Sequence, residues 1–387
     1  MTAKLGFIYH EDFLKYNFGK GHPLNSVRIQ MHKDLLELNS FFNNPDIQLI
    51  EAKPCSDEDL LTVHTPDYID FIRKLSERGE GSVDDKDTPA FKNMFEITKT
   101  AVGGTVTAVD EVMHGNIAHA WNPGGGFHHA KRDSGGGFCI FNDIAIAIKR
   151  LINRYNVKRI LYLDIDAHHG NGVQDIFYDD SRVFKISLHE SGETLYPHSG
   201  FEEETGIGDG KGYNINIPLP IGTFDEAYIH IVYELIPLIA EFYDPQFIIL
   251  AAGADAHFLD PLSHLQLTSS TYIRIAELIH NLSHRFCGGK CIVLGAGGYS
   301  LNATPRIWSL IVSRLAGVEL KDEIPVEWRS KYTEYFKDDH APLKLLDDNP
   351  PKIDPERYKK ISKYVSEITN RVRENVFMLY GFFKLIK

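Results

Sequence analysis

A stretch with two aspartates and two histidines carries the side chains best suited to chemistry in this chain. From Arg159 to Gly172 the sequence reads RILYLDIDAHHGNG, an apolar run followed by Asp164, Asp166 and His168. The apolar run predicts a buried parallel strand that ends where the polar residues begin. Alternate residues of extended chain share a face, so Asp166 and His168 point the same way and offer two ligands to a divalent metal ion. Alone, an Asp-x-His pair is more often a hydrogen-bonded surface loop, and a third ligand must come from elsewhere.

Similar polar residues follow three other apolar runs that predict strands. They are His128 and His129 after Ile117 to Trp121, Asp255 after Phe247 to Ala252, and Tyr299 after Cys291 to Leu294. A tandem histidine pair alone is more often a solvated loop, but this pair lies between two glycine clusters that permit close backbone approach. The carboxyl ends of parallel strands meet at one edge of a sheet, where ligands bind. We therefore expect these residues to share one site with the Asp-x-His stretch.

The composition predicts a cytoplasmic globular protein. With 387 residues, 43% of them hydrophobic and 24% charged, the chain is long enough for one large α/β domain or two smaller ones. A net charge of −12 argues against direct nucleic-acid binding but permits a cationic partner. The four cysteines are scattered without a C-x-x-C pair, which favours a reducing compartment. The N-terminus lacks the apolar core of a signal peptide, and no apolar run reaches the length of a membrane span.

Short apolar runs alternate with helical patterns along the chain, which predicts a parallel sheet of about eight strands with helices on both faces. The expected strands are Gly6 to Tyr9, Gln48 to Ala52, Ile117 to Trp121, Arg159 to Leu163, Val183 to Leu188, Tyr213 to Pro218, Phe247 to Ala252 and Cys291 to Leu294. The expected helices are Val27 to Leu38, Ser56 to Val63, Pro66 to Ser76, Met94 to Met113, Asn142 to Tyr155, Phe224 to Tyr243, Ser269 to Phe286 and Thr304 to Ala316.

The C-terminal part differs in composition from the rest. We expect one domain over residues 1–317 and an extension over residues 318–387. The charged, proline-containing segment from Glu319 to Pro355 predicts surface chain without regular structure, followed by a helix that begins at Pro355. The final stretch, NVFMLYGFFKLIK, is apolar and is expected to pack on the domain or on a partner subunit. Membrane association is the weaker alternative, because the run is short.

Five motifs in order along the chain carry a resemblance to a known family. The segments GGGFHHA, GGGFCIFND, LDIDAHHGNGVQDIFY, AGADAH and GAGGYS closely resemble the zinc-dependent histone deacetylase family, especially its bacterial and archaeal acetoin-utilisation type. The likeness runs from about Phe7 to Gly317, and HPLNSVRIQM and YNINIPLP fit it as well. It implies a single open α/β domain of the kind shared with arginases, which agrees with the predicted strands.

The resemblance implies two bound ions. Asp166, His168 and Asp255 match the family's catalytic metal ligands. The metal is usually Zn²⁺, but two carboxylates and one imidazole also suit Fe²⁺ or Co²⁺. A structural K⁺ is implied as well, with ligands from a second set of residues: Asp164, Asp166, His168, Ser187 and Leu188. This ion would brace the loop that carries the metal ligands.

The resemblance also assigns the acid–base groups. His129 would take a proton from the attacking water and return it to the leaving amine, with His128 as its electrostatic partner. The Tyr299 hydroxyl would donate to the oxyanion of the tetrahedral intermediate. Asp164 would orient His128. Asn171 stands where many members have an aspartate paired with the second histidine, and this neutral partner predicts a shifted pH profile.

Substrate-binding residues are implied at five further kinds of position. Phe138 and Tyr196 match the aromatic pair of a narrow channel, Gly137 and Gly298 keep its walls close, Leu262 forms part of the rim, Asp87 matches a rim aspartate, and Arg28 lies in an internal cavity below the metal. An apolar tube suits the aliphatic stem of an acyl-lysine. Two of these matches have bland alternatives, since Asp87 can be a solvated loop charge and Arg28 plain structure.

The resulting hypothesis is a metal-dependent amidohydrolase that removes acetyl or another short acyl group from lysine side chains of proteins or peptides. An acetylpolyamine amidohydrolase is the main alternative, although Leu262 stands where polyamine-specific members carry an acidic gatekeeper. A catalytically silent acyl-lysine-binding protein is a second alternative. A two-manganese, ureohydrolase-like enzyme is a third, for which no full second ligand set is visible. The sequence leaves open whether the chain forms oligomers.

Overall fold

Eight parallel strands form one sheet at the centre of the protein. The computed structural model describes residues 3–84, 87–337 and 340–379. The strands are β1 (Ala3–Tyr9), β2 (Ile47–Glu51), β3 (Ile117–Asn122), β4 (Ile160–Asp164), β5 (Val183–Glu190), β6 (Asn214–Leu219), β7 (Phe247–Ala251) and β8 (Cys291–Leu294). Their order across the sheet is β2-β1-β3-β8-β7-β4-β5-β6, and every pairing is parallel. This confirms the predicted α/β fold and its eight strands.

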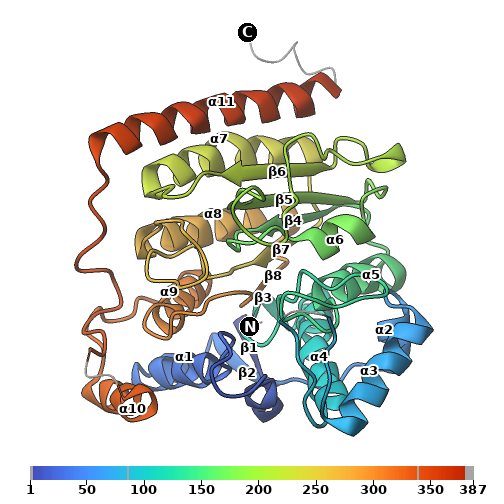
Figure 1. Ribbon diagram of the computed structural model, residues 1–387, viewed down its shortest axis with the longest axis vertical. Helices are drawn as coiled ribbons and strands as arrows, with labels where there is room; N and C mark the ends of the chain where they lie inside the picture. The colour runs from blue at the N-terminus through green and yellow to red at the C-terminus, as the bar shows by residue number, and fades with distance from the viewer. Residues whose placement is uncertain (1–2, 85–86, 338–339, 380–387) are drawn as a thin grey trace.

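Helices cover both faces of the sheet, which explains why the central strands are apolar along their whole length. Every residue of β4, β5, β7 and β8 is buried. On one face α1 (Val27–Leu38), α9 (Thr304–Ala316), α8 (Ser269–Cys287) and α7 (Asp225–Tyr243) pack in a row. The first three lie to the left of the sheet in Figure 1. The remaining helices of the domain lie to the right: α2 (Asp57–Leu61), α3 (Pro66–Arg78), α4 (Met94–Met113), α5 (Asp143–Tyr155) and α6 (Asn171–Ile176).

The start of α5 holds the histidine loop in place. The Asn142 side chain caps this helix by accepting a hydrogen bond from Ala145 N at 2.9 Å. The same amide donates to the carbonyl of Ala130 at 2.9 Å, so one side chain ties the helix to the loop that follows β3. Asp143, the first residue of α5, accepts hydrogen bonds from Gly126 N at 3.0 Å and Phe127 N at 2.7 Å. The glycine-rich loop is therefore fixed by buried side chains of the next helix.

The prediction of irregular structure from Glu319 to Pro355 is wrong for its middle part. Residues Val326–Phe336 form a further helix, α10, in which Trp328 and Tyr332 are buried one turn apart. Trp328 packs against Met31 and Leu35 of α1 and donates its indole N–H to the carbonyl of Met31 at 2.7 Å. Two aromatic residues in an otherwise charged segment were too weak a periodic signal to predict this helix.

The chain after α10 runs along the outside of the molecule to its opposite end. Figure 1 shows this segment passing from α10, beside α1, to α11 (Pro355–Leu379), which packs on α7 and β6. The apolar residues of α11, among them Ile361, Val365 and Ile368, face this contact and are buried. Residues 380–387 of the apolar terminal stretch lie outside the described residues. The division of the chain at residue 317 stays a prediction.

Candidate metal centre and catalytic pocket

The four loops that carry the predicted chemistry follow four neighbouring strands. The sheet places β3, β8, β7 and β4 side by side, and His128, Tyr299, Asp255 and Asp166 follow their respective carboxyl ends. The sequence orders these strands third, eighth, seventh and fourth, so their adjacency is a property of the fold alone. Because the sheet is parallel, all four loops open at the same edge.

Asp166, His168 and Asp255 form a buried cluster with the geometry of a metal site. One ligand atom from each lies within 4.8 Å of the others. His168 Nδ1 lies 2.9 Å from Asp255 Oδ2 and 3.1 Å from Asp166 Oδ1. Burial, followed by the charge of Asp166, raises the pKa of Asp255 to about 8, since two carboxylates share one water-poor site. A divalent cation offsets this repulsion, and two carboxylates with one imidazole fit such an ion.

Main-chain glycine makes room for the two carboxylates. A Cβ atom on Gly297 would lie 2.5 Å from Asp166 Oδ2 and would also collide with the Asp255 carboxylate. The backbone N–H of Gly297 instead donates to Asp166 Oδ2 at 2.7 Å. Glycine is thus required at position 297, in the motif GAGGYS, because the loop after β8 passes against the metal ligands.

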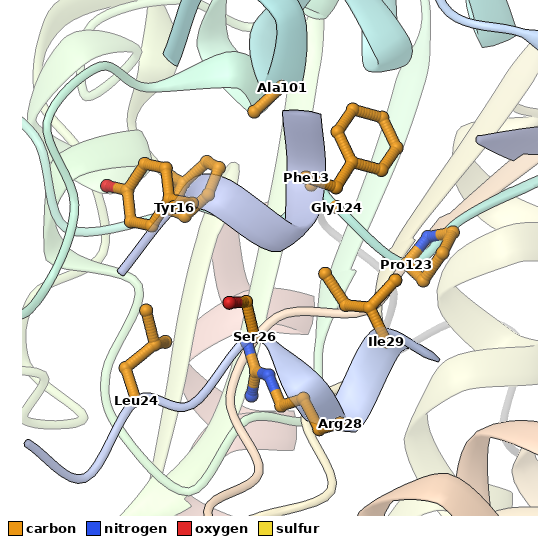
Figure 2. A pocket seen from close by; sticks show the side chains of 11 residues that line it. Phe13, Tyr16, Leu24, Ser26, Arg28, Ile29, Ala101, Pro123 and Gly124 are labelled. Atoms are coloured by element: carbon orange, nitrogen blue, oxygen red, sulfur yellow. The ribbon is translucent and has the colours of Figure 1, made fainter. Parts of the chain in front are cut away.

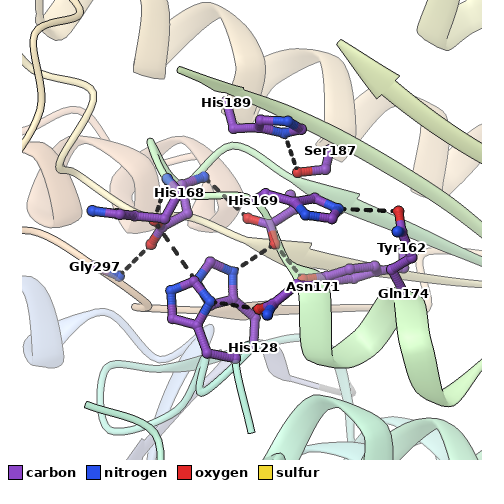
Figure 3. Close-up of polar contacts among 12 residues, drawn as sticks. His128, Tyr162, His168, His169, Asn171, Gln174, Ser187, His189 and Gly297 are labelled. Carbon is purple, nitrogen blue, oxygen red and sulfur yellow. Dashed lines mark hydrogen bonds and ion pairs between the residues drawn. The ribbon is translucent and has the colours of Figure 1, made fainter. Parts of the chain in front are cut away.

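The tandem histidines are linked to each other and to two orienting groups (Figure 3). His128 Nδ1 lies 2.7 Å from Asp164 Oδ2, and His129 Nδ1 lies 2.8 Å from Asn171 Oδ1. The two Nε2 atoms are 3.0 Å apart. Tyr162 also donates its hydroxyl to Asp164 Oδ2 at 2.5 Å, so that carboxylate is held from two sides.

The two histidines have opposite electrostatic environments. Burial lowers the pKa of His128, but the charges of Asp164 and Asp166 outweigh it and raise that pKa to about 9. Burial and the neighbouring His128 and His168 lower the pKa of His129 well below its usual value. These opposite shifts favour the protonated form of His128 and the neutral form of His129. Adjacent groups with pKa values pushed apart in this way are typical of acid–base sites.

Tyr299 lies beside these groups in a single pocket. The pocket is lined by His128, His129, Asp166 and Tyr299, with Phe138 at its wall. The rings of Tyr299 and His168 meet edge to face with centroids 6.3 Å apart. The loop that carries the tyrosine is fixed by Asp260, whose carboxylate accepts hydrogen bonds from Tyr299 N at 2.7 Å and Ser300 N at 3.2 Å.

Asp260 and Asp143 are positioning residues that the sequence did not reveal. Each accepts backbone N–H groups of another loop, 39 and 40 positions away for Asp260 and 17 and 16 for Asp143, and such a partnership leaves no local spacing pattern. Burial raises the pKa of both carboxyl groups, that of Asp260 to about 6. Asp143 is the last residue of the segment GGGFCIFND, so the resemblance covered it without giving it a role, and Asp260 lies two positions before the predicted rim residue Leu262.

The predicted channel residues divide into two groups. Gly137, with φ +55°, lies against His129, and a Cβ atom there would lie 2.4 Å from His129 Cδ2. The Tyr196 ring meets His129 edge to face at 5.0 Å, and Phe138 meets Tyr299 in the same manner at 5.6 Å. These three residues therefore pack directly against His129 or Tyr299.

The other predicted channel residues either do not line the pocket or make contacts that involve main-chain groups. Leu262 is half-buried and does not line the pocket, and its N–H donates to Asp260 at 2.9 Å. Gly298 contributes its carbonyl, which accepts from Arg28 at 2.6 Å. Asp87 lies at the channel through Gly137, whose N–H donates to Asp87 Oδ1 at 3.2 Å. Burial and the neighbouring Asp84 raise the pKa of Asp87.

Arg28 separates the catalytic pocket from a second, internal cavity (Figure 2). It lines both spaces and lies over the Trp308 ring at 4.9 Å. Figure 2 shows Ser26, Arg28 and Ile29 on one side of the cavity and Phe13 and Tyr16 on the other. Burial lowers the pKa of the guanidinium group, while the charges of Tyr299, Asp255 and Asp166 oppose that shift. Arg28 is therefore the charged residue among those that line both spaces.

The residues predicted to bind K⁺ lie on two neighbouring strands, β4 and β5, and on the metal-ligand loop itself, and Asp164 is paired with Ser187 in the sheet. Ser187 Oγ is 2.8 Å from His189 Nδ1, and the Leu188 carbonyl faces the Tyr228 hydroxyl at 3.5 Å. Asp164 Oδ1 accepts from Asp166 N at 3.1 Å. A structural K⁺ at this position stays a prediction.

Comparison with known proteins identifies the family. A model of the histone deacetylase domain matches residues 22–315, so the chain belongs to the histone deacetylase family. Family membership indicates a deacetylase, which is a hydrolase, in a family that generally depends on a metal. Among solved structures, a histone deacetylase homologue complexed with SAHA is 30% identical, and the match covers 96% of this chain and 100% of that one with a TM-score of 0.82. A homologue from Aquifex aeolicus is 31% identical with a TM-score of 0.81 and the same coverage.

Within the family, the chain is of the acetoin-utilisation type. It is 42% identical over 334 residues to acetoin utilization protein AcuC of Bacillus subtilis, a match that covers 84% of this chain and 86% of that protein. The AcuC protein of Staphylococcus xylosus is 33% identical over 373 residues, with 94% and 96% covered. Across the described ranges of the chain, none of the helices combines the length and apolar character needed to cross a membrane.

Proposed function

We propose that this protein is a metal-dependent deacylase that removes acetyl or other short acyl groups from lysine side chains of proteins or peptides. One observation carries the proposal: the metal cluster, the histidine pair and the Tyr299 ring meet around a single pocket. A Zn²⁺ ion held by Asp166, His168 and Asp255, or Fe²⁺ or Co²⁺ in its place, would polarise the amide carbonyl and lower the pKa of the attacking water.

The side chains of the pocket supply proton transfer and charge stabilisation. His129, kept as the free base, takes the proton from the attacking water and later gives it to the departing amine. His128, protonated and held by Asp164, keeps positive charge beside the reacting atoms. The Tyr299 hydroxyl donates a hydrogen bond to the oxyanion that forms from the carbonyl oxygen.

The entrance supports a lysine side chain as substrate. Tyr196 packs its ring against His129 and Phe138 packs its ring against Tyr299, while Gly137 has no side chain to collide with His129 or Tyr196. A four-carbon aliphatic stem fits between aromatic walls, while the charged groups stay at the inner end. Asp87 at the outer end can accept hydrogen bonds from backbone amides of a bound peptide. We place this activity in the cytoplasm, because the four cysteines are free and buried.

The proposal is tested with acyl-lysine peptides and acylpolyamines as substrates of the metal-loaded protein and of Tyr299→Phe. We expect peptide deacylation by the wild type, and a fall in kcat of about 10²- to 10³-fold in the variant, because one oxyanion donor is lost. Metal content should be equal in both, since Tyr299 is not a ligand. Undiminished turnover in the variant would remove Tyr299 from the mechanism. If only the acylpolyamines release acetate, the substrate is a polyamine and not an acyl-lysine. If no substrate releases acetate, the protein binds acyl-lysine without hydrolysing it.

A further inference from the structure

Three histidines gather near the amino-terminal ends of the central strands, whereas the catalytic pocket lies at the carboxyl ends. His119 lies in the first half of β3, in register with Cys291 at the start of β8, whereas the catalytic loops leave the other ends of these strands. His280 and His284 lie four residues apart on α8, so their side chains share one face of that helix. One ring nitrogen from each of the three histidines lies within 4.8 Å of the others.

The contacts within this cluster are those of metal ligands brought close together. His119 Nε2 lies 3.2 Å from His284 Nε2, and the His119 and His280 ring centroids are 5.0 Å apart. The Nδ1 atoms of His119 and His280 are buried and have no hydrogen-bond partner among the described residues. A buried ring nitrogen without a partner carries a desolvation cost, so two such rings beside a third imidazole are an unusual arrangement.

The cluster is reachable from solvent. His119 is 1% exposed, His280 is half-buried, and the side of the cluster formed by His284 is exposed. A metal ion can therefore enter past His284 and keep water in its remaining coordination positions. Three imidazoles without a carboxylate favour Zn²⁺, Ni²⁺, Cu²⁺ or Co²⁺ over Mg²⁺ or Ca²⁺, which prefer oxygen ligands.

We propose that His119, His280 and His284 form a second metal site, which binds one divalent transition-metal ion and links β3 to α8. A bound ion joins a central strand to a helix that packs against β7 and β8. The three nitrogens are close together only in the folded chain, so binding of the metal ion stabilises the native state by mass action. None of the three histidines takes part in the proposed catalytic mechanism, so this proposal does not depend on the proposed function.

The test measures how many ions the full chain binds. The protein is stripped with a chelator and dialysed against Ni²⁺ or Zn²⁺, and bound metal is then counted. We expect His280→Gln/His284→Gln to bind one ion per chain fewer than the wild type, or to bind it at least about tenfold more weakly. His284→Gln alone changes an exposed position and should lower the affinity for the same ion without disturbing the fold. His230→Gln, an exposed histidine on α7, is the matched control and should bind as the wild type does.

A variant of the catalytic cluster separates this proposal from the other. Asp166→Asn should remove a different ion and leave the histidine ion bound. Thermal unfolding adds a second readout, in which Ni²⁺ should raise the melting temperature of Asp166→Asn but not that of Asp166→Asn/His280→Gln/His284→Gln. Equal ion counts and equal affinities in the wild type and in His280→Gln/His284→Gln would overturn the proposal, whatever the result for Asp166→Asn.

Discussion

At the scale of single residues, Asn171 distinguishes this pocket from one that uses a second carboxylate. Its amide oxygen accepts from His129 at 2.8 Å and therefore fixes the ring and its tautomer without adding charge. Asp164 performs the same orienting contact for His128 with a full negative charge. The division of labour between the two histidines thus depends on which partner is ionised.

Replacing Asn171 by aspartate should move the pH profile. A carboxylate beside His129 stabilises the imidazolium form and raises the pKa of the ring, so a higher pH is needed to free the base. We expect the acid limb of kcat/KM for Asn171→Asp to shift upward by about one pH unit. Asn171→Ala, which removes the hydrogen bond without adding charge, should lower turnover without that upward shift. A profile for Asn171→Asp that superimposes on the wild type would show that Asn171 does not tune His129.

At the scale of elements, the sequence predicted the strands, which are marked by continuous apolar runs. It missed the features that depend on one or two side-chain contacts. The eight strands follow from apolar runs, because a strand covered on both faces must be apolar throughout. The motif residues of the pocket were found because each follows such a run. The roles of Asp260 and Asp143 were missed because each binds the backbone of another loop, which no spacing pattern reveals. The helix α10 was missed because only Trp328 and Tyr332 mark its buried side.

The helix α10 should contribute substantially to stability through one side chain. Trp328 is fully buried and its indole N–H donates to Met31 of α1. We expect Trp328→Ala to lower the free energy of unfolding by about 3 kcal/mol, because it leaves a large cavity and removes the indole hydrogen bond. Trp328→Phe should cost less, since it keeps most of the packing. Urea unfolding monitored by circular dichroism measures both, and wild-type stability in the alanine variant would contradict the assigned packing.

At the scale of the whole molecule, the chain between α10 and α11 is anchored halfway by Asp347. Its carboxylate accepts from Arg306 at 3.0 Å, His257 at 3.0 Å and Ser269 N at 2.7 Å. Burial raises the pKa of Asp347, but the contacts with His257 and Arg306 outweigh it and hold the pKa well below its usual range. The outer segment is thereby fixed to α9 and to the start of α8.

Loss of this anchor should destabilise the protein in a pH-dependent way. A carboxyl group with a lowered pKa in the folded state stabilises that state above the pKa of the unfolded chain, about 3.9, and the contribution fades as the pH falls below it. We expect Asp347→Asn to lower the free energy of unfolding by about 3 kcal/mol at pH 7, with a smaller difference from the wild type near pH 3. Asp348→Asn, at a half-exposed neighbouring site, is the control and should change little. A difference that grows on acidification would contradict this assignment.

The position of β7 and β8 between β3 and β4 has a consequence for synthesis on the ribosome. A nascent chain that has emerged only as far as β6 cannot close the sheet, because its two halves are separated by the width of two missing strands. Each half then exposes unpaired strand edges, which favour association with other chains. The last-made strands complete the sheet, and the loops that follow them carry Asp255 and Tyr299 to the pocket. Shortened translation products that end before residue 291 should therefore be clients of chaperones and proteases rather than weakly active enzymes.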